Sequence, residues 1–444
     1  MARLQHLPQA AKLFLAGGVM ALSFQPFPFG FIAWFGLVPL ILAWMGTSEP
    51  LRGAYLGFMW ALGFLFGLIY WLAFNSGTVW WAATVSMIAS VLFLGLNYAF
   101  VGWWFVWLRN RWGSAALGML PLLWTTVEYI RSFGPLGFPW IALANSQAEY
   151  LLPIQNAEIT GIYGLSFWLV LVNVILVDLI RHRRYPIAIP ALLAVFALPW
   201  LTGWWLLPRE PVPTLRIGIV QPNTNALEKW APEIRNQHFE QLNRLTRQVA
   251  ADSPRIVFWP EAATPAYLRR GGASYLRQIQ QNLRELQLTV VTGMPEYERT
   301  RAGEINYFNA VGLIDSTGIG QQYNKISLVP FGEYIPLSGW ITGLKKLNLG
   351  QGNFTHGAEY TVFQAGSFPF STGVCYETTM PHLYRTFVKA GATYLVGLVN
   401  DAWFGSTSEP YQHTAQFRYR AVEFRRPVVR SANTGISIVI DQRG

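Results

Sequence analysis

The sequence is poor in charged residues. Only 13% of its 444 residues are Asp, Glu, Lys or Arg, where a soluble globular protein carries about 25%. The shortage lies in one half of the chain, because only nine of the 33 Lys and Arg and five of the 23 Asp and Glu precede residue 208. A charge-poor half followed by a half of ordinary charge predicts a membrane domain joined to a water-exposed domain.

Two further absences exclude classes of protein. Cys375 is the single cysteine, which excludes a framework of intramolecular disulfides. The chain has no run of Lys and Arg interleaved with aromatic residues, so its net charge of +10 does not indicate a nucleic-acid partner. Much of the basic excess lies in short loops between apolar segments, where membrane topology explains it. We expect no separate cleavable signal, because the first apolar segment leads directly into others.

The first half contains long apolar segments instead. A helix needs about 20 apolar residues to cross a membrane, and we predict seven spans, at about 8–24, 30–46, 53–74, 81–108, 114–130, 161–181 and 186–207. With a cytoplasmic N-terminus, the inner loops carry eight Lys and Arg and the outer loops carry only Arg131. This asymmetry follows the positive-inside rule. An odd number of spans then places the second half outside the cytoplasm.

The predicted outer loop 131–160 is aromatic and almost uncharged. Phe138 and Trp140 lie in its Gly-Phe-Pro-Trp run. Such side chains commonly form a belt at the membrane interface. The alternative is a lipid-facing wall beside an active site, and the sequence leaves both interpretations open.

The second half has the pattern of an α/β layer fold. Short apolar runs bounded by turn residues predict strands, and amphipathic patterns between them predict helices. The predicted strands are 215–221, 255–259, 288–293, 308–314 and 394–399, and the predicted helices are 232–251, 272–286, 379–390 and 414–426. We therefore divide the chain into a membrane domain (1–207), a proline-rich linker (208–214) and an α/β domain (215–444), which we expect to lie outside the cytoplasm.

Three polar side chains lie at positions where a strand is expected to end. They are Glu261 in Trp-Pro-Glu, Lys325 in Tyr-Asn-Lys and Cys375 in Gly-Val-Cys-Tyr-Glu. A carboxylate, an ammonium and a thiol supply the base, the oxyanion partner and the nucleophile of acyl transfer. A helix after Cys375 would favour its thiolate through the helix dipole. Taken singly, such residues more commonly have no catalytic role: the carboxylate lies in a solvated turn, the lysine lies on the surface and the thiol packs in the core.

The wording and order of these motifs resemble the nitrilase superfamily with its Glu–Lys–Cys triad. Together with the hydrophobic half, they are similar to one branch, the bacterial apolipoprotein N-acyltransferases. The runs 137–140, 220–223, 400–405 and 431–435 also resemble this branch. The resemblance implies a multi-span α-helical membrane domain and an α/β nitrilase-like domain that forms an α-β-β-α sandwich.

The resemblance also implies roles for particular residues. Glu261 would be the general base, Lys325 the oxyanion-stabilising cation and Cys375 the nucleophile. The supporting positions would be Glu333, Tyr376, Glu377 and Trp230, with Trp140 and Phe138 as candidates for lipid contact. No metal and no cofactor would be needed. The family continues into one further membrane helix, so we expect that the sequence lacks the end of the catalytic domain and that helix.

The implied reaction transfers an acyl chain from the sn-1 position of a phospholipid, through a Cys375 thioester, to the α-amino group of a diacylglyceryl-cysteine at an apolipoprotein N-terminus. The expected location is the bacterial inner membrane, with the catalytic domain in the periplasm, and the expected state is a monomer. One alternative is a membrane-tethered nitrilase-type amide hydrolase. Another is a transporter or lipid-binding protein with an inactive sensor domain. The segments 267–272 and 332–352 are either mobile arms over the site or ordered connections.

Overall fold

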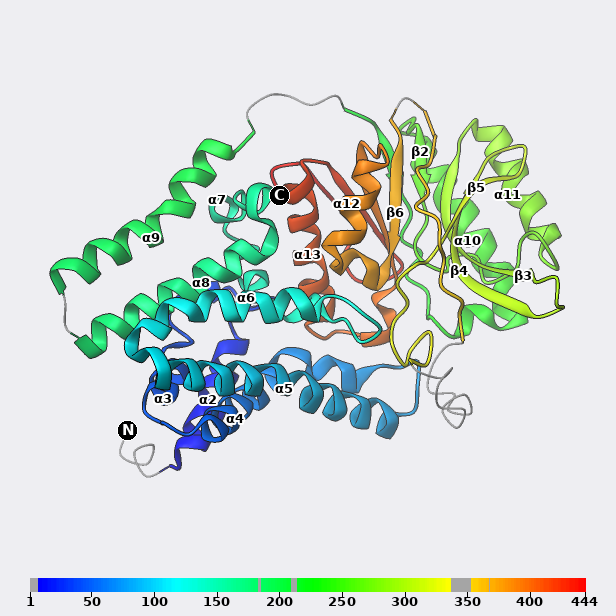
Figure 1. Cartoon of the computed structure of the whole chain (residues 1–444). Helices are drawn as coiled ribbons and strands as arrows, with labels where there is room; N and C mark the ends of the chain where they lie inside the picture. The colour runs from blue at the N-terminus through cyan, green and yellow to red at the C-terminus, as the bar shows by residue number, and fades with distance from the viewer. Residues whose placement is uncertain (1–6, 183–184, 209–213, 337–352, 367) are drawn as a thin grey trace.

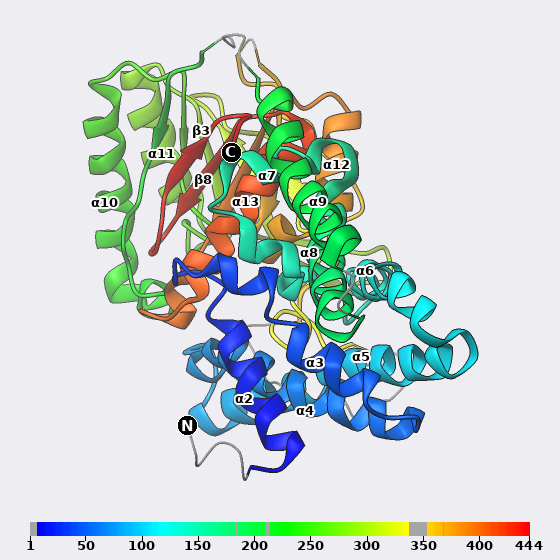
Figure 2. The same ribbon diagram turned by 90° about the vertical axis from the view of Figure 1, so that its left-hand side faces the viewer.

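The computed structural model describes residues 7–182, 185–208, 214–336, 353–366 and 368–444 (Figure 1). The predicted linker 208–214 lies mostly outside this part of the chain, and so does most of the segment 332–352. A helical domain formed by the first half lies against a two-sheet domain formed by the second half (Figures 1 and 2).

A helix lies in each of the seven predicted spans. The main ones are α2 (Gln9–Ala21), α3 (Val38–Met45), α4 (Pro50–Ile69), α5 (Trp80–Trp112), α6 (Leu120–Arg131), α8 (Ala157–His182) and α9 (Tyr185–Leu206). By length and composition, four stretches of the described chain could cross a membrane: Pro50–Phe74, Trp80–Arg131, Ala157–His182 and Tyr185–Leu206. The apolar stretch Gly30–Met45 is shorter. Seven membrane crossings therefore remain a prediction.

Glycines allow these helices to pack closely. A Cβ atom on Gly63 of α4 would lie 1.8 Å from the carbonyl oxygen of Phe14 in α2. A Cβ on Gly102 of α5 would lie 2.3 Å from the carbonyl oxygen of Gly53 in α4. Such contacts leave no room for a larger residue. Close backbone approach at small residues is the usual packing mode of helices in a membrane.

The second domain is an α-β-β-α sandwich. The first sheet has the order β1-β2-β3-β4-β5 and the second has the order β6-β7-β8-β9. The strands are β1 (Ile217–Ile219), β2 (Ile256–Phe258), β3 (Val290–Arg299), β4 (Ile305–Ile314), β5 (Ile319–Asn324), β6 (Phe370–Val374), β7 (Tyr394–Val399), β8 (Val428–Ala432) and β9 (Ile438–Ile440). Neighbouring strands are parallel along β1-β2-β3 and β6-β7-β8, and the remaining pairs are antiparallel.

Helices cover the outer face of each sheet. α10 (Pro232–Ala250) and α11 (Ala273–Leu286) lie on the side away from the helical domain. α12 (Pro381–Lys389) and α13 (Glu409–Phe424) lie on the side that faces it. Between the sheets, the rings of Phe258, Phe370 and Tyr394 pack with centroids 5.0 to 6.5 Å apart. Apolar burial on both faces explains why the strands lack polar alternation.

α13 joins the two domains. Its Gln412 accepts hydrogen bonds from the indole N–H groups of Trp71 and Trp140, at 3.1 and 2.9 Å. Further along the helix, Tyr419 donates to the carbonyl oxygen of Ala144, and Glu423 accepts from the backbone N–H of Ile162 at 2.9 Å. Trp140 and Ala144 of the predicted outer loop 131–160 therefore contact α13.

Candidate active site

The three predicted catalytic residues follow the ends of three strands. Glu261 comes three residues after β2, and Lys325 directly follows β5. Cys375 directly follows β6 and opens η8 (Cys375–Thr379), a short 3₁₀ helix. The first two strands belong to one sheet and β6 belongs to the other. The site therefore lies where the two sheets meet, and neither sheet alone would form it.

Lys325 lies between two carboxylates. Its Nζ is 2.8 Å from Glu333 Oε2 and 3.8 Å from Glu261 Oε1. The lysine side chain is fully buried, and burial alone would lower its pKa. The carboxylates of Glu333 and Glu261 outweigh that effect and raise the pKa of Lys325 well above its ordinary value. The site therefore holds a permanent cation beside the thiol.

Asn309 orients both carboxylates, and we did not identify it from the sequence. Its Nδ2 donates to Glu261 Oε1 at 2.8 Å and to Glu333 Oε1 at 2.9 Å. Burial raises the pKa of Glu261, the nearby Glu333 carboxylate raises it further, and Lys325 opposes the rise. An amide inside the apolar run of β4 was the available signal, since buried polar groups need partners.

Cys375 is in the left-handed backbone region, with φ of +48°. Burial raises the pKa of its thiol well above the ordinary value, and the Glu261 carboxylate adds to the rise. Lys325 opposes it without reversing it. The expectation that a helix dipole favours the thiolate is therefore wrong. η8 spans five residues, too few for a large dipole. The thiol of Cys375 would therefore have to lose its proton to act as a nucleophile.

Glu377 ties the cysteine turn to the lysine turn. Its Oε1 accepts from the backbone N–H groups of Ile326 and Ser327 at 2.7 and 2.8 Å and from the Tyr323 hydroxyl at 2.8 Å. Its Oε2 accepts from the N–H of Val374 at 2.8 Å. Burial raises the pKa of Glu377 to about 7, against the effect of Lys325 and these donors. Glu377 therefore fixes the position of Cys375 relative to Lys325.

Aromatic side chains connect the site to the helical domain. The Tyr376 hydroxyl donates to the carbonyl oxygen of Gly137, and its ring stacks on Phe138 with centroids 6.2 Å apart. Trp140 is buried, and its ring lies 5.2 Å from that of His413. The structure thus places Trp140 between the two domains, and lipid contact by Trp140 and Phe138 remains a prediction.

The predicted supporting residue Trp230 lies in η6 (Glu228–Trp230) and is partly exposed. Its neighbour Lys229 points inward instead and donates from Nζ to the carbonyl oxygen of Ala262 at 2.6 Å. Burial lowers the pKa of Lys229 to about 8, although the Glu261 carboxylate opposes this. A second buried cation therefore lies behind the Glu261 turn, and no local sequence pattern indicates it.

A cavity of about 370 Å³ lies beside the site. The helical domain contributes Ser132 and Phe133 to its wall, and the catalytic domain contributes Ser327, Leu328 and Tyr376. Polar and apolar groups share the lining. The cavity lies at the junction of the two domains and therefore suits a substrate that has both polar and apolar parts.

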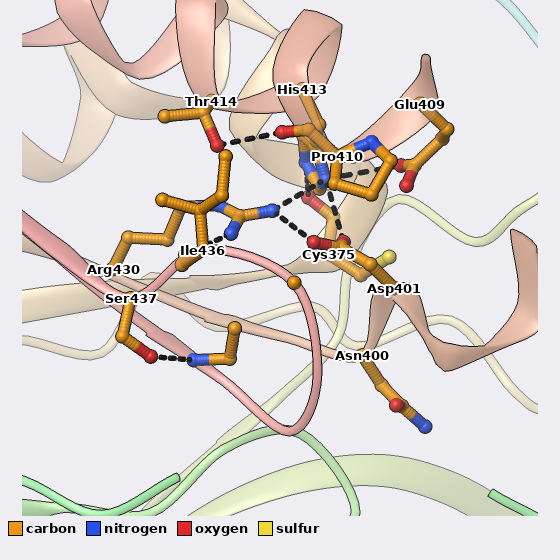
Figure 3. A network of polar contacts seen from close by, with 12 residues as sticks. Cys375, Asn400, Asp401, Glu409, Pro410, His413, Thr414, Arg430, Ile436 and Ser437 are labelled. Carbon is orange, nitrogen blue, oxygen red and sulfur yellow. Dashed lines mark hydrogen bonds and ion pairs between the residues drawn. The ribbon is translucent and has the colours of Figure 1, made fainter. Parts of the chain in front are cut away.

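Within the described chain, one trio has the donor set of a metal site. Ligand atoms of Asp401, Glu409 and His413 lie within 4.8 Å of one another (Figure 3). Arg430 already neutralises this group, because its Nη2 lies 2.7 Å from Asp401 Oδ2 and 3.3 Å from His413 Nδ1. A divalent cation would have to displace a buried guanidinium, so the trio does not fit a metal.

Two sequence families match this chain. Residues 16–175 match the family described as the apolipoprotein N-acyltransferase N-terminal domain, and residues 216–444 match the carbon-nitrogen hydrolase family. A protein from Geobacter metallireducens named apolipoprotein N-acyltransferase is 36% identical, over 97% of this chain and 84% of its own length. A protein of the same name from Methylococcus capsulatus is 31% identical, over 98% and 86%.

Solved structures of the nitrilase superfamily are more distant. A Saccharomyces cerevisiae member of branch 10 of that superfamily shares 15% identity with a TM-score of 0.38, over 52% of this chain and 83% of its own. A carbon-nitrogen hydrolase from Helicobacter pylori shares 14% identity with a TM-score of 0.37, over 52% and 82%.

Proposed function

The chain belongs to the apolipoprotein N-acyltransferase family, and we propose that it transfers an acyl chain from the sn-1 position of a phospholipid to the α-amino group of a diacylglyceryl-cysteine at an apolipoprotein N-terminus. We place the catalytic domain on the periplasmic side of a bacterial inner membrane, with residues 1–207 as its membrane domain. The observation that carries the proposal is the buried set of Glu261, Lys325 and Glu333 beside the single cysteine.

The first half-reaction acylates the enzyme. Glu261 takes the proton from Cys375 as the sulfur attacks the ester carbonyl, because the resting thiol is protonated. Lys325 and the backbone N–H of Tyr376 stabilise the oxyanion. The bond from carbonyl carbon to glycerol oxygen then breaks, and Glu261 returns its proton to that oxygen. A lysophospholipid leaves and a thioester remains.

The second half-reaction restores the enzyme. The neutral amine of the acceptor attacks the thioester carbonyl and gives a proton to Glu261, while the same two donors hold the oxyanion. The carbon–sulfur bond breaks, the amide leaves, and Glu261 returns the proton to the Cys375 sulfur. Protons balance over the cycle, and no other group is consumed.

Two features of the protein support lipid substrates. Large apolar side chains are exposed on the helical domain, among them Trp80, Val85, Leu96, Ile187, Leu193 and Trp205. Such a surface is stable in the hydrocarbon of a membrane. The cavity beside Tyr376 also lies at the junction with this domain. A lipid could therefore pass from the membrane to the cavity beside Tyr376, the residue that follows Cys375.

The test is the intact mass of the purified protein after incubation with a diacyl phosphatidylethanolamine and no acceptor. We expect the mass to rise by one acyl chain, and Cys375→Ala to remain unmodified. A diacylglyceryl peptide should then remove the adduct and become N-acylated. Discharge by water as fast as by the peptide would support the tethered hydrolase instead, and no adduct would refute the acyl-enzyme.

A further inference from the structure

Helix α13 contacts the backbone carbonyl group of Cys375. Within this helix, His413 is fully buried, and its Nε2 lies 3.3 Å from the carbonyl oxygen of Cys375 (Figure 3). The same Nε2 lies 2.8 Å from Thr378 Oγ1. The Thr378 hydroxyl donates to the same carbonyl oxygen at 2.8 Å. Two side chains therefore converge on one backbone atom of the nucleophile.

Donor and acceptor rules determine where the His413 proton lies. The one hydroxyl proton of Thr378 goes to the Cys375 carbonyl, and a carbonyl oxygen can only accept. With that assignment both atoms near His413 Nε2 act as acceptors toward it, and a hydrogen on Nε2 satisfies both of them.

The groups around Nδ1 are compatible with a hydrogen on Nε2 in both the neutral and the protonated imidazole ring. Asp401 Oδ1 lies 3.3 Å from Nδ1, Glu409 Oε1 lies 3.4 Å from it and Arg430 Nη2 lies 3.3 Å from it. A neutral ring accepts from Arg430, and a charged ring donates to the carboxylates. Burial disfavours the charged ring, but Asp401 and Glu409 outweigh this effect and raise the pKa of His413.

The carbonyl matters because of the peptide plane that it shares. The oxygen of Cys375 and the N–H of Tyr376 belong to one planar trans peptide and point in opposite directions. Any rotation of that carbonyl turns the N–H of Tyr376 by the same angle. This N–H is the proposed oxyanion donor. The plane also needs support, since Cys375 has a φ of +48°, which side chains with a Cβ avoid.

We propose that His413, oriented by Asp401 and Arg430, is a positioning residue of the acyl transfer. Together with Thr378 it fixes the 375–376 peptide, which aims the oxyanion donor and keeps the thiol beside Glu261 and Lys325. This inference rests on the proposed function, since the N–H of Tyr376 has a role only if an oxyanion forms.

A pair of substitutions distinguishes the two nitrogen atoms of the His413 ring. The amide nitrogen of Gln reaches about the position of His Nε2, and that of Asn reaches only about the position of Nδ1. His413→Gln therefore keeps the donor to the Cys375 carbonyl, and His413→Asn loses it. We expect single-turnover acylation by phosphatidylethanolamine to fall ~10²-fold in His413→Asn and His413→Ala, and less than ~10-fold in His413→Gln.

A purely structural role would not produce this ranking. We expect the acylation rate at saturating lipid to fall while the half-saturating lipid concentration stays constant. Thr378→Val and Thr378→Ser form a second pair, in which only the serine keeps the hydroxyl and only the valine should be slow. Thermal unfolding of each full-length variant shows that it is folded. Equal rates for Gln and Asn, with equal rates for Val and Ser, would overturn the proposal.

A second readout needs no lipid. Cys375 is the single cysteine, so the pH profile of its alkylation by iodoacetamide reports on its surroundings alone. We expect the midpoint to move to higher pH in His413→Asn, as the thiol leaves Lys325, and to stay in place in His413→Gln. No acylation of the unsubstituted protein would refute the proposed function, whereas unchanged alkylation in His413→Asn would refute the positioning role. A stoichiometric divalent ion lost from His413→Asn would also overturn it.

Discussion

The ammonium of Lys325 lies 2.8 Å from Glu333 but 3.8 Å from Glu261. Glu333 is the closer counter-ion, and it also accepts the backbone N–H of Val329 at 2.8 Å. Glu261 keeps a hydrogen bond from Asn309, the more distant Lys325 cation and a weaker influence of the buried Lys229. Of the two carboxylates, Glu261 is therefore less neutralised and better able to take a proton. This asymmetry fits the proposed roles of Glu261 as the base and Glu333 as a supporting residue.

The asymmetry predicts a pH effect in Glu333→Gln. The Glu333 carboxylate raises the pKa of Glu261, so its removal should lower that pKa. Acylation needs Glu261 ionised and therefore rises with pH through this pKa. We expect the acid limb of the pH–rate profile, where the acylation rate rises with pH, to move to lower pH by about one unit. The plateau rate should fall ~10-fold, because the base is weaker.

The control for this measurement is Glu333→Asp, which keeps the charge and should keep most of the acid limb in place. The rates are measured by quenched single turnovers with phosphatidylethanolamine. A limb that stays in place, or moves to higher pH, in Glu333→Gln would show that Glu333 does not act on the base.

The raised pKa of Glu377 predicts how the stability of the folded protein depends on pH. Its pKa is raised to about 7 by burial, whereas the unfolded value is about 4.3. The folded state therefore binds the proton more tightly, and its contribution to stability is complete below about pH 4. The contribution is lost as the pH rises through about 7, and its full size is on the order of 3 kcal/mol.

Glu377→Gln removes this ionisation, so its unfolding free energy should fall less between pH 4.5 and 8 than that of the unsubstituted protein. Glu409 titrates in the same window, with a pKa raised to about 7 by burial and Asp401. The difference between the two curves therefore isolates Glu377. Thermal or denaturant unfolding in one detergent measures it, and parallel curves would contradict the prediction.

Trp140→Ala tests the prediction that this residue contacts lipid. Loss of a buried Trp costs about 3–5 kcal/mol, and Gln412→Ala should also destabilise the domain junction, because Gln412 accepts from both Trp71 and Trp140. Lipid contact further predicts a raised half-saturating lipid concentration in Trp140→Ala but not in Gln412→Ala. Equal lipid dependence in the two variants would leave Trp140 as an anchor between the domains.

Local pattern was enough to predict part of the catalytic domain. Apolar runs bounded by turn residues predicted strands over β1, β2, β3, β4 and β7, and β7 has the predicted bounds. No bounds were predicted for β5, β6, β8 and β9. Of these strands, β5 is polar at three of its six positions. It pairs with β4 at the edge of the sheet, where one partner strand is enough. Its stability depends on that pairing rather than on its own side chains.

The sequence by itself determined the charge-poor half, the strand–helix alternation and the identity of Glu261, Lys325 and Cys375 as candidates, because periodicity and motif order are local properties. Tertiary structure alone decided the protonation of Cys375, the inward side chain of Lys229 and the bridging role of Asn309. It also brought His413 to the nucleophile from 38 residues away along the chain. Burial and the distance between charges set these properties, and both arise only when the two sheets and the helical domain pack together.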